Sequence, residues 1–87
     1  MYDIEIAPFA LKSLDRLKRI HKNIADRVVA AIDSLRSDPS KGKKLAGDLS
    51  DFRSLRVGEY RILYTVIRKR VLIQIVKTAH RREVYRA

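Results

Sequence analysis

The side chains that could do chemistry gather in the second half of the sequence, where arginine is abundant. Residues 80–86 read HRREVYR, and Arg61 stands further upstream in a short apolar segment that has the periodicity of a strand. An arginine offers planar, bidentate hydrogen bonds to a phosphate and keeps its charge. A histidine ordinarily titrates near neutral pH, so His80 is suited to accept and donate protons. This combination predicts a ligand that contains phosphate.

Cleavage of RNA without a metal has three chemical requirements, and these residues are candidates to meet them. The 2′-hydroxyl must lose a proton, the charged phosphorane must be stabilised, and the leaving 5′-oxygen must receive a proton. Arg61 is predicted to stabilise the phosphorane, because an arginine on an apolar sheet face is costly unless an anion pairs with it. Arg81 and Arg82 are candidates for the same role, one facing the site and the other facing solvent. His80 is predicted to move the protons.

Each of these assignments has a plainer alternative. His80 could be a surface histidine at the end of a strand, and Arg61 could form a salt bridge to Glu59 or to the C-terminal carboxylate. Tyr85 could stack on an exposed base or donate a hydrogen bond to the scissile phosphate. It could equally hold the end of the chain against the sheet, and both interpretations stay open.

Other basic residues extend this surface. Arg53 and Arg56 are predicted to contact backbone phosphates, with ordinary strand-edge charge as the alternative. Lys43 and Lys44 follow Lys41 in a basic run. Such runs usually form solvated loops.

The net charge is unevenly distributed along the chain. The formal charge is +10 over 87 residues, and residues 53–87 hold ten Lys and Arg against two Asp and Glu, which gives +8. Residues 1–52 hold ten against eight, which gives +2. A dense basic patch attracts polyanions, so nucleic acid is the leading candidate for a partner. An acidic protein and a merely solvated surface are the alternatives.

Length and composition argue against several classes of protein. A chain of 87 residues is expected to form one domain with one modest core. The absence of cysteine excludes a disulfide framework and a thiolate nucleophile, and two distant histidines argue against a zinc site. No apolar run approaches the ~20 residues of a membrane span, and the N-terminus lacks a signal-peptide pattern. We expect a cytoplasmic protein that binds no membrane, metal or small-molecule cofactor.

The hydrophobic pattern predicts an α+β fold. Residues 2–7 alternate as a strand does, with Ile4 and Ile6 buried. Two amphipathic helices follow, one over about 8–19 and one that starts near residue 24 and is ended by Asp38-Pro39. The short break at 21–23 predicts an antiparallel helical hairpin, and 40–51 is expected to be a polar loop. Closely spaced strands near 52–57, 59–67 and 71–78 predict a three-stranded antiparallel meander, followed by a short C-terminal tail or helix. Arg61 would share a face with Leu63, Thr65 and Ile67.

Two motifs resemble the RelE branch of the RelE/ParE toxin superfamily. They are LRVGEYRILY at 55–64 and AHRREVYR at 79–86, and the order of elements extends the resemblance over 1–87 as a single RelE-like toxin domain. The resemblance implies the toxin of a type II toxin–antitoxin system. It implies a metal-independent endoribonuclease that cuts mRNA in the ribosomal A site and inhibits translation. The implied partners are the ribosome, with its mRNA and rRNA, and a cognate antitoxin. In such a toxin Lys43 and Lys44 would help to grip ribosomal RNA.

The sequence departs from the family pattern in the first strand of the meander. Some RelE-like toxins use two alternating lysines there, where residues 53–56 read RSLR. Arginine is a poor general base, so proton transfer would fall to His80. Two other functions suit the same fold. One is a ParE-like toxin that poisons DNA gyrase, against which the short helical hairpin and the HRREVYR motif argue. The other is a catalytically degenerate partner and co-repressor of an antitoxin.

Overall fold

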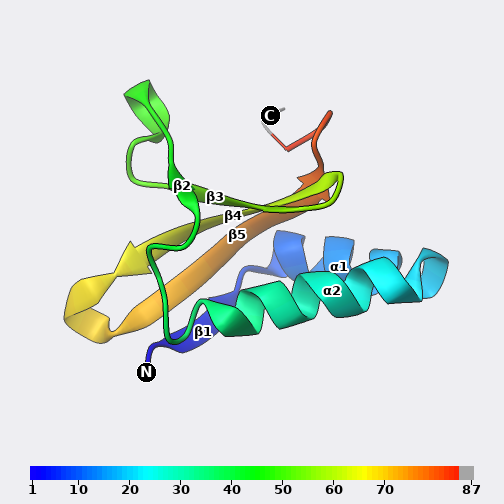
Figure 1. Ribbon diagram of the computed structural model, residues 1–87, viewed down its shortest axis with the longest axis horizontal. Coiled ribbons are helices and arrows are strands. Elements are labelled where there is room, and N and C mark those ends of the chain that lie inside the picture. Colours follow the sequence, from blue (N-terminus) through cyan, green and yellow to red (C-terminus); the bar gives the residue numbers. More distant parts are fainter. Residues whose placement is uncertain (85–87) are drawn as a thin grey trace.

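The computed structural model describes residues 1–84, in which five strands form one sheet with two helices on one of its faces (Figure 1). The helices are α1 (Pro8–Ile20) and α2 (Lys22–Ser34), and two single turns of 3-10 helix are η1 (Gly47–Leu49) and η2 (Arg68–Arg70). The strands are β1 (Asp3–Ile6), β2 (Lys43–Lys44), β3 (Arg53–Val57), β4 (Tyr60–Ile67) and β5 (Leu72–His80). This order confirms the predicted α+β fold.

The sheet has the strand order β1-β5-β4-β3-β2. Strands β3, β4 and β5 form the predicted antiparallel meander, and β1 pairs in parallel with β5 at one edge. The other edge differs from the expectation of a polar loop over 40–51. Lys43 and Lys44 form the short strand β2 against β3. Two consecutive lysines carry no strand pattern, so this pairing depends on the loop returning alongside β3.

The helical hairpin covers one face of the sheet and closes the core. Pro8 occupies the first turn of α1, where its missing N–H costs no hydrogen bond. The break between the helices is confined to His21, because α2 begins at Lys22 rather than after the expected break at 21–23. Apolar side chains from one side of each helix are buried and pack on the inner face of β4 and β5. These core residues are Ala10, Leu14, Leu17, Ala25, Val28, Ile32, Leu35, Ile62, Tyr64, Ile73 and Ile75.

The other face of the sheet is left open by the helices. Alternation along β4 turns Ile62 and Tyr64 toward the helices and Arg61 and Leu63 away from them. Figure 1 shows that the connection carrying η1 and the turn after β5 both rise on this open side. They therefore flank the part of the sheet that carries Arg61. No helix within residues 1–84 is both long and apolar enough to cross a membrane.

Candidate phosphate-binding cleft

A cleft of about 470 Å³ lies on the open face of the sheet. Four different parts of the chain line it: the β2 segment, β3, β4 and the turn after β5. Its lining residues are Lys43, Leu45, Ser54, Arg61, Arg81 and Arg82. We call this hollow the arginine cleft. Among the described residues, four of the six side chains that line it are cationic, which makes it a site for an anion.

The β3–β4 hairpin fixes the position of Arg61. Val57 pairs with Tyr60, so the turn between them has only two residues, and its first residue, Gly58, has φ +58°. Tight hairpins require positive φ at this position, which favours glycine. The resulting register places Arg61 directly opposite Arg56 on the open face. Like charges in this arrangement repel each other, and a bound anion would relieve the repulsion.

A second row of side chains runs across the sheet beside this pair. Lys43 pairs with Ser54, which in turn pairs with Leu63, so all three share the open face. Leu63 and Ser54 are buried, whereas Lys43 is exposed. Strand β2, although it has only two residues, therefore brings an ammonium group to the edge of the cleft.

The loop before β2 is held on the other side of the sheet by a buried tyrosine. The Tyr64 hydroxyl donates to the carbonyl of Pro39 at 2.8 Å and accepts the N–H of Gly42 at 2.8 Å. Burial raises the pKa of the Tyr64 phenol, although the hydrogen bond from Gly42 and the charge of Arg53 act in the opposite direction. Arg53 Nη1 donates to the Gly42 carbonyl at 2.8 Å. These contacts fix the backbone that delivers Lys43.

Arg81 is oriented by Glu59. Its Nε lies 2.7 Å from Glu59 Oε2, and its backbone N–H donates to the Glu59 carbonyl at 2.7 Å. Both side chains are slightly more than half exposed, so this ion pair is partly screened by water. Glu59 was one possible partner for Arg61, and the structure pairs it with Arg81 instead. Within residues 1–84 the Arg61 side chain has no ion pair, so its guanidinium is available to a ligand.

His80 lies outside the arginine cleft. It pairs with Tyr60 across β4 and β5, and the two rings meet edge to face with centroids 5.7 Å apart. Both line a separate hollow of about 570 Å³ beside α1, which we call the helix-side cleft. The strand register explains the separation: Ala79 is opposite Arg61, and the next residue points to the other face. The structure thus does not bring His80 and Arg61 together as the proton-transfer prediction requires.

Residues 4–85 match the family model described as the ParE toxin of the type II toxin–antitoxin system parDE. The chain belongs to this toxin family. The resemblance to the RelE/ParE superfamily, inferred from its two motifs, is therefore confirmed. No protein of curated function matches the sequence significantly.

Solved structures of several toxins share the fold of this ParE-family chain. The toxin–antitoxin complex RelBE2 from Mycobacterium tuberculosis matches with 27% identity and a TM-score of 0.81, over 91% of this chain and 96% of that one. The YoeB/ParE toxin from Agrobacterium tumefaciens matches with 16% identity and a TM-score of 0.79, over 90% and 96%. The intact E. coli RelBE toxin–antitoxin complex matches with 16% identity and a TM-score of 0.78, over 92% and 96%.

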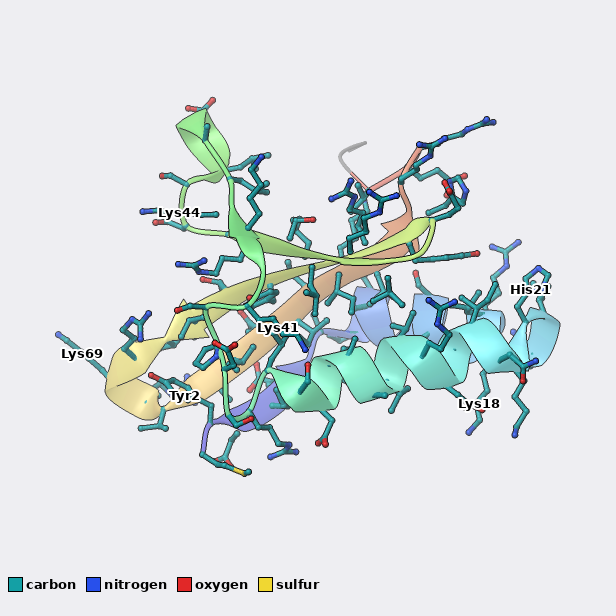
Figure 2. The ribbon with its side chains drawn as sticks, viewed as in Figure 1. Tyr2, Lys18, His21, Lys41, Lys44 and Lys69 are labelled. Carbon is teal, nitrogen blue, oxygen red and sulfur yellow. The ribbon has the colours of Figure 1, made fainter. Side chains whose placement is uncertain are left out.

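The remaining candidate residues of the toxin are dispersed. Arg53 lies on the helix side of the sheet, where it holds the Gly42 loop, and Arg56 is exposed with its Nε donating to the Gly58 carbonyl at 3.3 Å. Figure 2 shows the Lys44 side chain of β2 extending away from the ribbon, and Lys44 is exposed and does not line the arginine cleft. Arg82 lines it together with Arg81, whereas one of these two arginines was expected to face solvent, and Tyr85 lies outside the described residues.

Ser54 is the polar cleft residue for which the sequence indicated no role. The signal that could have identified it is the register of the hairpin. With a two-residue turn at Gly58–Glu59, Val57 pairs with Tyr60, and counting back along both strands places Arg56 opposite Arg61 and Ser54 opposite Leu63. All four side chains share the open face, because directly paired residues point to the same side.

Proposed function

We propose that this toxin is a ribosome-dependent endoribonuclease that binds the backbone of mRNA in the arginine cleft. Cleavage would proceed by attack of the 2′-hydroxyl without a metal, and translation would stop. The supporting observation is the convergence of Lys43, Arg61, Arg81 and Arg82 on one open face of the sheet. Preorganised cations of this kind stabilise the charge that develops on a phosphorane.

Arg61 and Arg81 have distinct roles in this mechanism. Arg61 has no internal ion pair within residues 1–84, so it is free to bind the scissile phosphate bidentately. Arg81 is held by Glu59 through its Nε, and its terminal nitrogens remain for a phosphate oxygen. The geometry supports a role for His80 in positioning Arg82, because the His80 Nδ1 accepts the backbone N–H of Arg82 at 3.2 Å.

Proton transfer explains why the ribosome is part of the proposal. The described lining of the arginine cleft contains no histidine and no carboxylate. Arginine and lysine ordinarily stay protonated at neutral pH and are weak general bases. We therefore expect the isolated toxin to cleave free RNA slowly, and the ribosome to complete the site.

A cognate antitoxin is the second proposed partner. The RelBE2 and RelBE structures that resemble this chain are toxin–antitoxin complexes. Residues 53–87 carry ten basic against two acidic side chains, so the open face would attract RNA without discrimination unless a partner covers it. We expect an acidic segment of the antitoxin to cover the arginine cleft.

The proposal is tested by primer extension on an mRNA translated in a reconstituted ribosomal system. Wild type should produce cuts in A-site codons, and Arg61→Ala should reduce them by a factor on the order of 10²–10³ through loss of electrostatic stabilisation. Arg70→Ala is the matched control, because it removes the same charge from η2, at the far end of β4. Unimpaired translation with no cuts by wild type would contradict the proposal.

A gyrase-directed toxin is the second candidate function. The family model is that of ParE toxins, and poisoning an enzyme by binding needs no proton-transfer group in the arginine cleft. A supercoiling assay separates the two: inhibition of DNA gyrase with ribosomes unaffected would favour this candidate. Inactivity in both assays, with tight antitoxin binding, would favour a catalytically degenerate co-repressor.

A further inference from the structure

The floor of the arginine cleft contains a buried hydroxyl without a partner. Ser54 is 4% exposed and lines the cleft, and its Oγ makes no hydrogen bond within the part of the chain that is described. Buried polar side chains in native proteins are nearly always hydrogen-bonded, because an unpaired one loses its contacts with water and gains nothing in return. An orphan hydroxyl at the bottom of a cleft therefore points to a ligand.

The neighbours of Ser54 define the chemistry of that ligand. Lys43 is its direct cross-strand partner on one side, so their Cβ atoms lie about 5 Å apart. Arg61 is its diagonal neighbour on the other side, at roughly 7–8 Å. Both cations are hydrogen-bond donors and cannot accept the serine proton. An acceptor that satisfies all three groups at once is an oxyanion with several oxygens.

We propose that the Ser54 hydroxyl donates a hydrogen bond to a phosphate oxygen, while Lys43 and Arg61 bind other oxygens of the same phosphate group. Ser54 is thus a substrate-contacting residue. That the phosphate belongs to RNA rests on the proposed function. The phosphate site itself does not, because it can be measured with a ligand that is not cleaved.

The proposal predicts opposite effects of Ser54→Ala on stability and on binding. Removal of an unsatisfied buried hydroxyl should raise the melting temperature of the free toxin. The same substitution removes a hydrogen bond to a charged group, so affinity for phosphate should fall about tenfold. If Ser54 had a purely structural role, Ser54→Ala would not lower the affinity, and its effects on melting temperature and on binding would not be opposite.

The test uses the full chain and a fluorescent DNA trinucleotide, which presents backbone phosphates but has no 2′-hydroxyl to attack. Fluorescence anisotropy gives its affinity, and thermal melting of the ligand-free toxin gives stability. Ser54→Thr keeps a hydroxyl and should stay within about threefold of wild type. Thr65→Ala is the matched control: its hydroxyl donates to the Asp51 carbonyl at 2.8 Å, so its loss should lower the melting temperature and leave affinity unchanged.

Two results would overturn the proposal. One is an unchanged affinity of Ser54→Ala for the trinucleotide, and the other is a melting temperature that stays constant or falls. Serine-dependent binding by a toxin that never cuts ribosome-bound mRNA would support the phosphate site and remove the nuclease function. The two proposals can therefore fail separately.

Discussion

The side chain of Arg61 combines a fixed backbone position with an unpaired charge. The two-residue turn at Gly58 sets it opposite Arg56, and no carboxylate within residues 1–84 pairs with it. Such a pair of arginines destabilises the free protein slightly, because like charges face each other across the strands. The arrangement becomes favourable when an anion lies between them. We interpret this local conflict, like the orphan hydroxyl of Ser54, as a sign of a binding site.

His80 provides a prediction at the scale of the single residue. His80→Ala should lower the rate of A-site cleavage by less than tenfold, because the imidazole faces the helix-side cleft and touches Arg82 only through the backbone. Loss of a true general acid or base would cost a factor of about 10²–10⁴. Primer extension between pH 6 and pH 8 measures both the rate and its pH profile. A decrease above a hundredfold, with a changed pH profile, would restore His80 as the proton-transfer group.

The stability of the toxin is expected to depend on pH in the alkaline range, because Tyr64 is buried. Burial raises its pKa in the folded state above the ordinary value of about 10. The unfolded chain therefore loses the phenol proton first, and the stability that the neutral phenol contributes is complete below about pH 10. That stability is lost as pH rises through the folded-state pKa. The free energy of unfolding, measured by urea denaturation from pH 8 to pH 11, should fall more steeply for wild type than for Tyr64→Phe.

The loop from Pro39 to Gly42 is the element that connects the core to the cleft. A Cβ at Gly42 would lie 2.7 Å from Tyr64 Oη and 2.8 Å from Tyr64 Cε1, closer than such contacts allow. Gly42→Ala should therefore lower the free energy of unfolding by about 1–3 kcal/mol, as overpacking does. It should also weaken binding of the DNA trinucleotide, because Lys43 is the next residue. Urea denaturation and anisotropy measure the two effects.

An unchanged stability of Gly42→Ala would show that the loop moves freely around Tyr64. The variant would then be expected to bind the trinucleotide as wild type does. Reduced stability with unchanged affinity would show that the Tyr64 contacts do not determine the position of Lys43. That result would contradict our inference that the Pro39–Gly42 loop connects the core to the cleft.

The elements that carry a strong local pattern were predictable from the sequence. Helical stripes such as Ala10, Leu14 and Leu17, and the alternation along β4, appear in the residues themselves, and the structure confirms them. Strand β2 and its lysine were not predictable, because their pairing with Ser54 depends on contacts between segments distant in sequence. The face on which His80 lies was not predictable for a related reason. The strand register decides on which face of the sheet the His80 side chain lies, and a shift of the register by one residue would place it on the opposite face.

At the scale of the whole molecule, the helices and the arginine cleft lie on different sides of one sheet. The helical hairpin buries the inner face, so the outer face is free to present arginines that a packed interface would exclude. The chain carries a formal charge of +10, and residues 53–87 contribute most of it. Such a distribution speeds encounter with polyanions and makes it dependent on ionic strength.

Salt dependence tests whether binding uses the arginine cleft or the diffuse charge of the whole surface. Each phosphate neutralised on a single strand contributes about −0.7 to the slope of log affinity against log salt. The four cations of the cleft therefore predict a slope of about −3 for a short uncleaved single strand, measured by anisotropy between 50 and 300 mM salt. Arg61→Ala and Lys43→Ala should each make the slope shallower by about 0.7.

Arg70→Ala provides the comparison for this measurement. It lowers the net charge of the toxin by the same amount, but η2 begins where β4 ends, several residues beyond Arg61. If the cleft binds the strand, Arg70→Ala keeps the wild-type slope, because only cations that contact phosphates release counterions. Equal reductions for Arg61→Ala and Arg70→Ala would mean that RNA is held by the summed charge of the surface. The arginine cleft would then contribute no more to RNA binding than other basic parts of the surface.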